Sequence, residues 1–169
     1  MVRAYALFAL PHRVRGGDGA GMSRILGVDF GERRVGLAIS DPTGLIARTA
    51  GIVERRSDQQ AAEHIARLVQ EWDAEAVVVG LPLNADGSEG FQARRTRRFA
   101  SLLQELLGER PVILWDESLS SVEARDLLAE RGKPSRRRRH HDDVAAAVIL
   151  QSYLDVRCRQ THSVTSSEE

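Results

Sequence analysis

Three carboxylates that lie far apart in the chain occupy positions where they could act together. Asp29 interrupts the apolar run "RILGVDF", Glu117 follows the apolar run "PVILW", and Asp142 begins the Ala-rich stretch "DDVAAAVILQSYLDV". A carboxylate within an apolar strand is costly to desolvate unless it is paired. Acids that converge also repel one another, and divalent cations such as Mg²⁺, which prefer hard oxygen ligands, remove that repulsion. The three acids therefore suit metal-assisted chemistry on phosphate groups.

Each acid also has a plainer explanation when it is taken singly. Asp142 could cap a helix, Glu117 could be a solvated loop acid, and Asp29 could form a turn at the end of a strand. A chain with 24 acidic residues always contains some triplet of acids. Spacing alone therefore leaves both interpretations open.

Strand and helix patterns alternate along the chain and would position these acids. Period-2 patterns and apolar runs predict strands over residues 24–30, 35–41, 45–53, 76–83 and 111–115, the first three as an antiparallel meander. Helical spacing and capping signals predict helices after Ser57 or Asp58, from the 84–90 loop to Gly108, from Ser120 to Gly132, and over 142–156. In open α/β sheets, sites form beyond the carboxyl ends of the strands, which is where we expect the acids to meet.

Length and composition predict one globular domain. A chain of 169 residues with 42% hydrophobic content fits a single core, which we place at residues 24–159. Residues 1–23 are interpreted as a disordered extension or a misassigned start, because Met22 directly precedes the first strand, and residues 160–169 as a flexible tail. The single cysteine, Cys158, excludes an internal disulfide and favours the cytoplasm. No apolar run approaches the roughly 18 residues of a membrane helix.

The charges are unevenly distributed although the net charge is zero. Residues 131–141, "RGKPSRRRRHH", contain basic side chains and no acid, and "RRTRR" at 94–98 adds four arginines. This distribution suits a surface that binds nucleic-acid phosphates. A solvated loop and a solvated helix face are the simpler alternative, because Lys133 is the only lysine and the arginine runs can reflect coding bias.

Four segments resemble the signatures of a known family. "GVDFGERRVGLAISD", "VVVGLPLNADGSEG", "DESLSSVEA" and "DDVAAAVILQSYLD" are similar, in order and spacing, to those of the bacterial YqgF (RuvX) family, over about residues 24–156. The resemblance implies an α/β ribonuclease H-like fold. Its five-stranded mixed sheet has three antiparallel and then two parallel strands, with helices on both faces. The family is described as Holliday junction resolvase-like and as a nuclease that matures the precursor of 16S rRNA.

The resemblance also implies a mechanism and a site. Asp29, Glu117 and Asp142 would be both the catalytic acids and the ligands of two Mg²⁺ or Mn²⁺ ions, with Asp29 bridging the two. Hydrolysis would leave 5′-phosphate and 3′-hydroxyl ends. Asp142 matches the family motif by its spacing from Gln151, whereas participation of Asp143 or of His141 stays open.

Further residues are candidates for binding the substrate. Nucleic-acid contacts are expected from Arg33, Arg34, Asn84, Ser88, Arg94, Arg136, Arg137, Arg138 and Arg139. The loop that contains Asn84 and Ser88 resembles a phosphate cradle. For Gly80 and Gly87, turn geometry explains the glycine equally well.

Two other functions are compatible with the sequence. Resolvases of the RuvC type carry a fourth acid where this chain has Ala145, so the domain could instead be a ribosome-assembly or transcription factor that binds nucleic acid with little catalysis. A sugar-kinase-like phosphate hairpin is disfavoured, because such proteins need two lobes and this chain has length for one. The expected partners are structured RNA or branched DNA and ribosomal assembly intermediates, with no membrane. RNA versus DNA, and monomer versus homodimer, stay open.

Overall fold

Six strands form one mixed sheet in the order β1-β6-β5-β2-β3-β4. The computed structural model describes residues 5–6, 24–117 and 141–164, with the backbone alone for residues 5–6, 141–143 and 160–164. The elements are β1 (Tyr5–Ala6), β2 (Arg24–Phe30), β3 (Arg34–Ser40), β4 (Ala47–Glu54), α1 (Asp58–Glu71), β5 (Ala74–Leu81), α2 (Phe91–Leu107), β6 (Val112–Asp116) and α4 (His141–Val164). The helix predicted from Ser120 to Gly132 lies outside the described residues.

The sheet has the predicted combination of strand directions. β2, β3 and β4 form an antiparallel meander, whereas β5 is parallel to β2, and β6 is parallel to β5. The carboxyl ends of β2, β5 and β6 therefore lie at one edge of the sheet. β1 adds a sixth strand that the sequence patterns do not predict, because only two residues pair, Tyr5 with Leu114 and Ala6 with Ile113.

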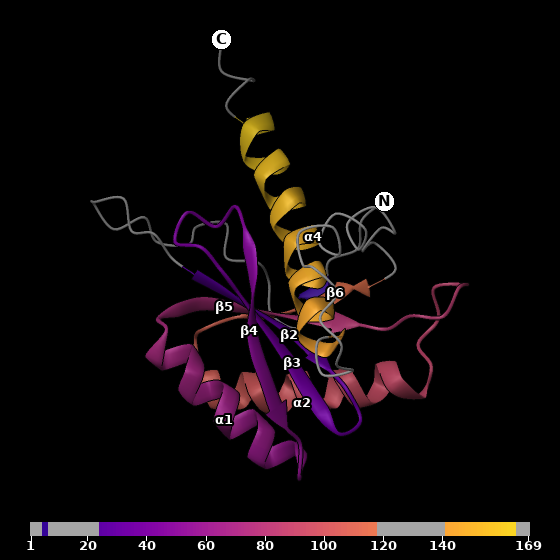
Figure 1. Ribbon diagram of the computed structural model, residues 1–169. Helices are drawn as coiled ribbons and strands as arrows, with labels where there is room; N and C mark the ends of the chain where they lie inside the picture. The colour runs from indigo at the N-terminus through magenta and orange to yellow at the C-terminus, as the bar shows by residue number, and fades with distance from the viewer. Residues whose placement is uncertain (1–4, 7–23, 118–140, 165–169) are drawn as a thin grey trace.

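The helices cover both faces of the sheet. α1 and α2 pack side by side on one face, and α4 crosses β2, β3 and β4 on the other (Figure 1). Ser57 caps α1 by accepting a hydrogen bond from the Gln60 backbone N–H, and Gly108, at φ 62°, ends α2 as predicted. α4 continues to Val164, past its predicted end at residue 156.

The sheet separates two apolar cores. The core under α1 and α2 contains large side chains such as Ile65 and Leu103, and the rings of Phe30 and Phe99 stack there with centroids 4.3 Å apart. The core under α4 is smaller and includes Ala146 and Ala147. No helix within the described residues is long and apolar enough to span a membrane.

Candidate active site

Asp29 lies on the α4 face of the sheet, near the carboxyl end of β2. Its neighbours Val28 and Phe30 belong to the core under α1 and α2. Because successive side chains of a strand point to opposite faces, Asp29 points to the α4 side, as does Gly27 two residues before it. A Cβ atom on Gly27 would lie 2.8 Å from Leu150 Cβ of α4. Asp29 is half-buried and lies two residues after Gly27, the position at which β2 contacts α4.

Glu117 lies on the same face, just past the end of β6, and Gly80 makes room for it. A Cβ atom on Gly80 would lie 2.6 Å from Glu117 Oε1 and 2.5 Å from Ile149 Cδ1. Val79 pairs with Val28 across β5 and β2, so Gly80 is the neighbour of Asp29 in the adjacent strand. Since adjacent strands lie about 4.8 Å apart, Asp29 and the Glu117 carboxylate occupy neighbouring positions at this edge of the sheet. Gly80 thus lies inside β5 and permits close approach, so turn geometry is the wrong explanation for this glycine.

The N-terminus of α4 points to the same edge. Arg157, near the other end of the helix, donates a 3.1 Å hydrogen bond to Glu75 at the start of β5, whereas Ile149 contacts Gly80 near the end of that strand. α4 therefore runs antiparallel to β5 and begins near the two carboxylates. Asp142 is in its first turn, one turn before Ala146, which lies over Gly27. The positive end of the helix dipole favours negative charge at this position.

The donor set fits divalent cations as far as the structure describes it. Asp29 and Glu117 supply two hard carboxylate oxygens at one sheet edge, the ligands that Mg²⁺ and Mn²⁺ prefer. No cluster of three or more potential ligands forms within the described side chains, which do not include those of residues 141–143. The role of Asp142 as the third ligand, and any part played by His141 or Asp143, therefore stay predictions.

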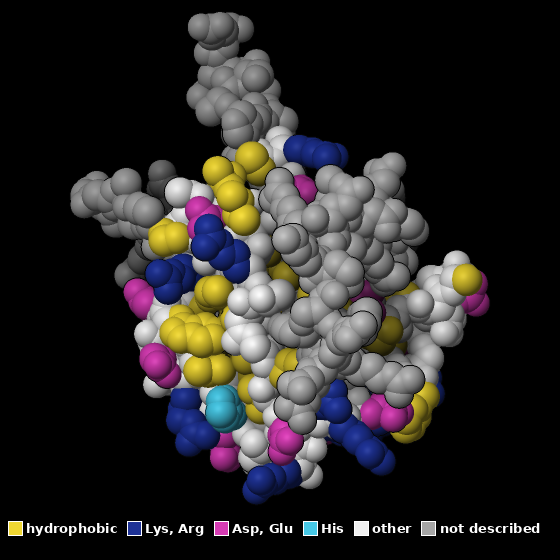
Figure 2. All heavy atoms as spheres, in the orientation of Figure 1, with side chains coloured by type: hydrophobic (Ala, Val, Ile, Leu, Met, Phe, Trp, Pro, Cys, Tyr) yellow, Lys and Arg dark blue, Asp and Glu magenta, His cyan; other side chains and the backbone are white. Residues whose placement is uncertain are grey.

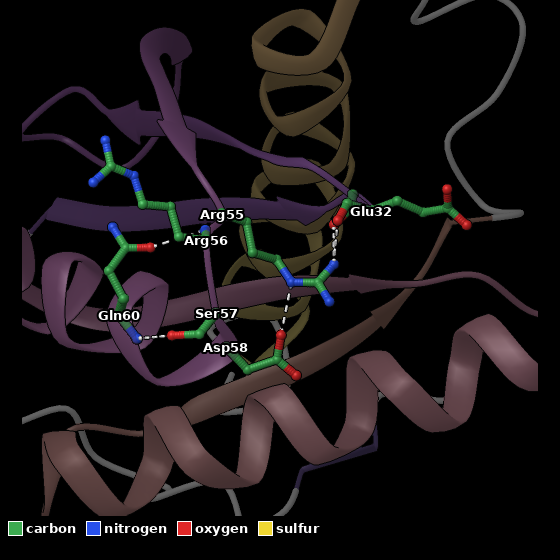
Figure 3. A network of polar contacts seen from close by, with 7 residues as sticks. Glu32, Arg55, Arg56, Ser57, Asp58 and Gln60 are labelled. Atoms are coloured by element: carbon green, nitrogen blue, oxygen red, sulfur yellow. Dashed lines mark hydrogen bonds and ion pairs between the residues drawn. The ribbon is translucent and has the colours of Figure 1, made fainter.

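The turn that follows β2 is held by Arg55, a residue that sequence reasoning missed. The Arg55 side chain, 10% exposed, donates through Nη1 to the carbonyl oxygens of Gly31, at 2.8 Å, and Glu32, at 2.7 Å. Its Nε donates to Asp58 Oδ1 at 2.7 Å, so that one guanidinium joins the turn to the start of α1 (Figure 3). The guanidinium also lies 4.5 Å from the Phe30 ring centroid. Nothing in "ERRSD" distinguishes Arg55 from Arg56, because the partners of Arg55 are mainly backbone carbonyls.

Arg33 and Arg34 lie where the sequence places them, on the turn beside Asp29. Both side chains are exposed, and the backbone N–H of Gly31 donates to the Arg34 carbonyl across the turn at 3.0 Å. A Cβ atom on Gly31 would collide with that carbonyl, so the tight turn requires glycine. The turn thus presents two arginines within a few residues of the candidate site.

Asn84 and Ser88 form a closed turn after β5. Asn84 Nδ2 donates to Ser88 Oγ at 2.9 Å, and Gly87, at φ 81°, provides the left-handed residue of the turn as predicted. Ser88 also donates to Asp86 through its hydroxyl and its backbone N–H, and these bonds hold the pKa of Asp86 below its usual value. Both predicted binding side chains thus serve the loop itself, and their contact with phosphate stays a prediction.

Arg94 is exposed in the first turn of α2, and Arg136 to Arg139 lie outside the described residues. Arg94 Nη1 donates to the Glu89 carbonyl at 3.0 Å, and Arg97 forms an ion pair with the Glu89 carboxylate that lowers its pKa. On the face in Figure 2, basic and acidic side chains of the coloured residues are interspersed. The described part of that face therefore has no single basic patch.

Two solved structures share this fold. RuvC of T. thermophilus in complex with Holliday junction substrate aligns with a TM-score of 0.61 at 14% identity, over 81% of this chain and 96% of that chain. The Fowlpox virus resolvase in complex with substrate Holliday junction DNA aligns with a TM-score of 0.51 at 15% identity, over 79% and 98%. These likenesses confirm the predicted ribonuclease H-like fold.

Curated relatives and a family model match most of the chain. A protein of Syntrophus aciditrophicus is 47% identical over 133 residues, which are 78% of this chain and 88% of the relative. One of Trichormus variabilis is 44% identical over 144 residues, 85% and 95% of the two chains. Both are named "Putative pre-16S rRNA nuclease". Residues 23–156 match the family model described as "RuvX: Holliday junction resolvase". The chain therefore belongs to the RuvX family of nucleases, as its four motifs predicted.

Proposed function

We propose that this protein is a metal-dependent endonuclease that hydrolyses phosphodiester bonds in structured nucleic acid. Its substrates would be the precursor of 16S rRNA, branched DNA such as a Holliday junction, or both. The names of its relatives support the first, and the family description with the solved resolvase complexes supports the second.

One observation carries the proposal. Glu117, from beyond β6, lies over Gly80, and Gly80 follows Val79, the strand partner of Val28, so that it neighbours Asp29 at the edge to which the N-terminus of α4 points. Two acids that are far apart in the chain are thus brought to one edge of the sheet, because Gly80 has no side chain to fill the space that Glu117 occupies.

Different residues would bind the metal ions and the phosphates. Asp29, Glu117 and Asp142 would hold two Mg²⁺ or Mn²⁺ ions. When bound, such ions lower the pKa of an attacking water and stabilise the leaving oxygen. Asp29 presents its carboxylate from the middle of a rigid sheet, which limits the positions it can take. Arg33 and Arg34 would contact the flanking phosphates, which adds affinity without sequence preference.

The test is a cleavage assay with two substrates. Purified protein would be offered a mobile four-way DNA junction and a precursor rRNA fragment with Mn²⁺, beside Asp29→Asn and Glu117→Gln. We expect cleavage of at least one substrate to products with 5′-phosphate and 3′-hydroxyl ends, and a loss of roughly a thousandfold in both variants, comparable to removing a group that stabilises transition-state charge directly. Glu71→Gln is the matched control, because Glu71 is exposed on α1, on the other face of the sheet.

Two outcomes would overturn the proposal. Binding of either substrate without cleavage by the wild type would indicate the assembly-factor alternative. Cleavage that survives both Asp29→Asn and Glu117→Gln would locate the catalytic centre elsewhere.

A further inference from the structure

The first residue of α2 carries an aromatic ring that the fold does not use. Phe91 is 63% exposed, the highest value for any large hydrophobic side chain among the described residues. Burying such a side chain contributes about 1.5–3 kcal/mol, and this ring forgoes most of that. By contrast, Phe30 and Phe99 stack inside the core, and Trp115 is buried under α4. Phe91 is thus an exposed aromatic surface, whereas the other aromatic rings among the described side chains are buried or partly buried.

One face of the Phe91 ring already has a cationic neighbour. The Arg95 guanidinium, one helical turn along α2, lies 5.7 Å from the ring centroid. The side chains of Arg94 and Arg98 are exposed on the same two turns, and α2 has no acid in its first turn. The acid that precedes α2, Glu89, is already bound by Arg97. On α2 itself the side chains around the ring are therefore basic, although Glu32 of the turn after β2 is bonded to Gln92, and this helix face suits an anionic partner better than an apolar one.

The start of α2 is joined to the turn that follows the Asp29 strand. Gln92 Nε2 donates to Glu32 Oε1 at 3.1 Å, which joins the start of α2 to the turn after β2. Glu32 follows Asp29 by three residues, in the turn that Arg55 holds. Phe91, directly before Gln92, is therefore held at the end of α2 that is bonded to this turn.

We propose that Phe91 is a stacking platform for an unpaired base of the nucleic acid, with Arg95 supporting the ring from one side and Arg94 and Arg98 near the backbone phosphates. Aromatic rings flanked by arginines bind single strands in this manner, because every base has a π-face and the arginines offset the phosphate charge. The base must be unpaired, because bases within a duplex are already stacked on both faces. The proposal rests on nucleic acid being the substrate, and it selects single-stranded or junction-flanking nucleotides next to the cleaved bond.

The test measures binding without divalent ions, so that it does not depend on cleavage. Phe91→Trp keeps the platform and adds a fluorophore, whereas Phe91→Leu keeps an apolar side chain and removes the π-face. We expect single-stranded RNA or DNA oligonucleotides to quench the fluorescence of the Trp variant beyond the wild-type background of Trp72 and Trp115, and a duplex of equal length to quench it much less. Phe91→Leu should bind the single strands roughly 5- to 150-fold more weakly, and Phe91→Trp should bind as tightly as the wild type.

Leu106→Ala is the matched control, because Leu106 is also exposed, at 38%, near the other end of α2. Comparison of RNA with DNA oligonucleotides then shows which backbone the platform accepts. Equal affinities of the wild type and Phe91→Leu, or no quenching of the Trp variant by single strands, would overturn the inference. Cleavage by the wild type in that case would leave the proposed nuclease function intact, whereas quenching without cleavage would support the platform and contradict the nuclease.

Discussion

The two faces of the sheet are built differently. Under α1 and α2, the core contains Ile65, Leu103 and the stacked pair of Phe30 and Phe99. Under α4, the core contains Trp115 and several aliphatic side chains, but the helix meets β2 at a small residue: Gly27 lies so close to α4 that a Cβ atom would be 3.0 Å from the Ala146 carbonyl oxygen. Large side chains keep helices at a distance, and small ones let backbones approach. The first face therefore supplies mainly stability, and the second brings the end of a helix close to two carboxylates.

One domain can therefore stabilise its fold mainly on one face of the sheet and place its candidate catalytic acids on the other. The α4 face accommodates a half-buried Asp29 because α4 begins near this acid and does not cover it fully, and the apolar core on the other face stabilises the sheet. Substitutions on the two faces should consequently separate the free energy of unfolding from the rate of cleavage.

The largest effect is expected from the α1/α2 face, on stability alone. Ile65→Ala removes a fully buried side chain from that core and should lower the free energy of unfolding by about 2–5 kcal/mol. Cleavage per folded molecule should not change, because Ile65 lies on the opposite face from Asp29. Denaturant unfolding and an assay at a temperature where both proteins are folded would measure the two quantities. A parallel fall in cleavage would mean that the faces are coupled.

On the α4 face, Gly80→Ala should reduce cleavage and leave the free energy of unfolding nearly unchanged. The new Cβ would meet two flexible side chains and no backbone, namely Glu117 at Oε1 and Cγ and Ile149 at Cδ1, which can rotate away at small cost to stability. Because Glu117 would leave the edge, cleavage should fall about 10- to 100-fold, as for loss of a group that orients a metal ligand. Gly27→Ala is the control: its Cβ would meet the Ala146 carbonyl oxygen and Leu150 Cβ, so the whole helix must move, and unfolding should be affected by about 1–3 kcal/mol. If Gly80→Ala and Gly27→Ala changed cleavage and the free energy of unfolding by equal amounts, the two glycines would not differ in role.

A smaller effect is expected at the turn that Arg55 holds. Arg55→Lys keeps the charge, but one ammonium group cannot maintain the geometry of Asp58 and two carbonyls. Loss of about one hydrogen bond should raise KM roughly fivefold through displacement of Arg33 and Arg34, with kcat nearly unchanged. Arg56→Lys, at the exposed neighbour, should alter neither constant. If the two lysine variants behave alike, Arg55 does not position the turn.

The smallest effect is expected at the opposite edge of the sheet. The Thr43 hydroxyl and the backbone N–H groups of Ile46, Leu45 and Thr43 lower the pKa of Asp41 from 3.8 to about 2. A lowered pKa in the folded state stabilises the fold above the unfolded value of 3.8, and this contribution disappears as the pH falls through about 2. The unfolding free energies of wild type and Asp41→Asn should therefore differ most near neutral pH and converge in acid, with cleavage unaffected. A difference that persists at the lowest pH would assign the effect to something other than the charge.

Local signals in the sequence predicted the elements and part of the site. The apolar runs, the Ser57 cap and Gly108 at the end of α2 act within a few residues, so patterns reveal them. Strand patterns suggested that Asp29 and Glu117 meet at the carboxyl ends of the strands, but only the family motifs selected this pair among the many acids, because their proximity depends on strand order. The clearance that Gly80 provides and the bonds from Arg55 to the turn carbonyls leave no local signature, since their partners lie far along the chain. β1 was missed because two residues are too few for a period-2 pattern.

Synthesis of the chain from its N-terminus means that α4 is made last. β2, with Asp29, is synthesised early, whereas α4 comes last and crosses the meander, as in the hydrogen bond from the Ala47 N–H to Gln151 Oε1. A nascent chain therefore folds its α1/α2 core before it can cover the other face. The edge that carries Asp29 thus gains its neighbouring helix only when synthesis of the chain is nearly complete.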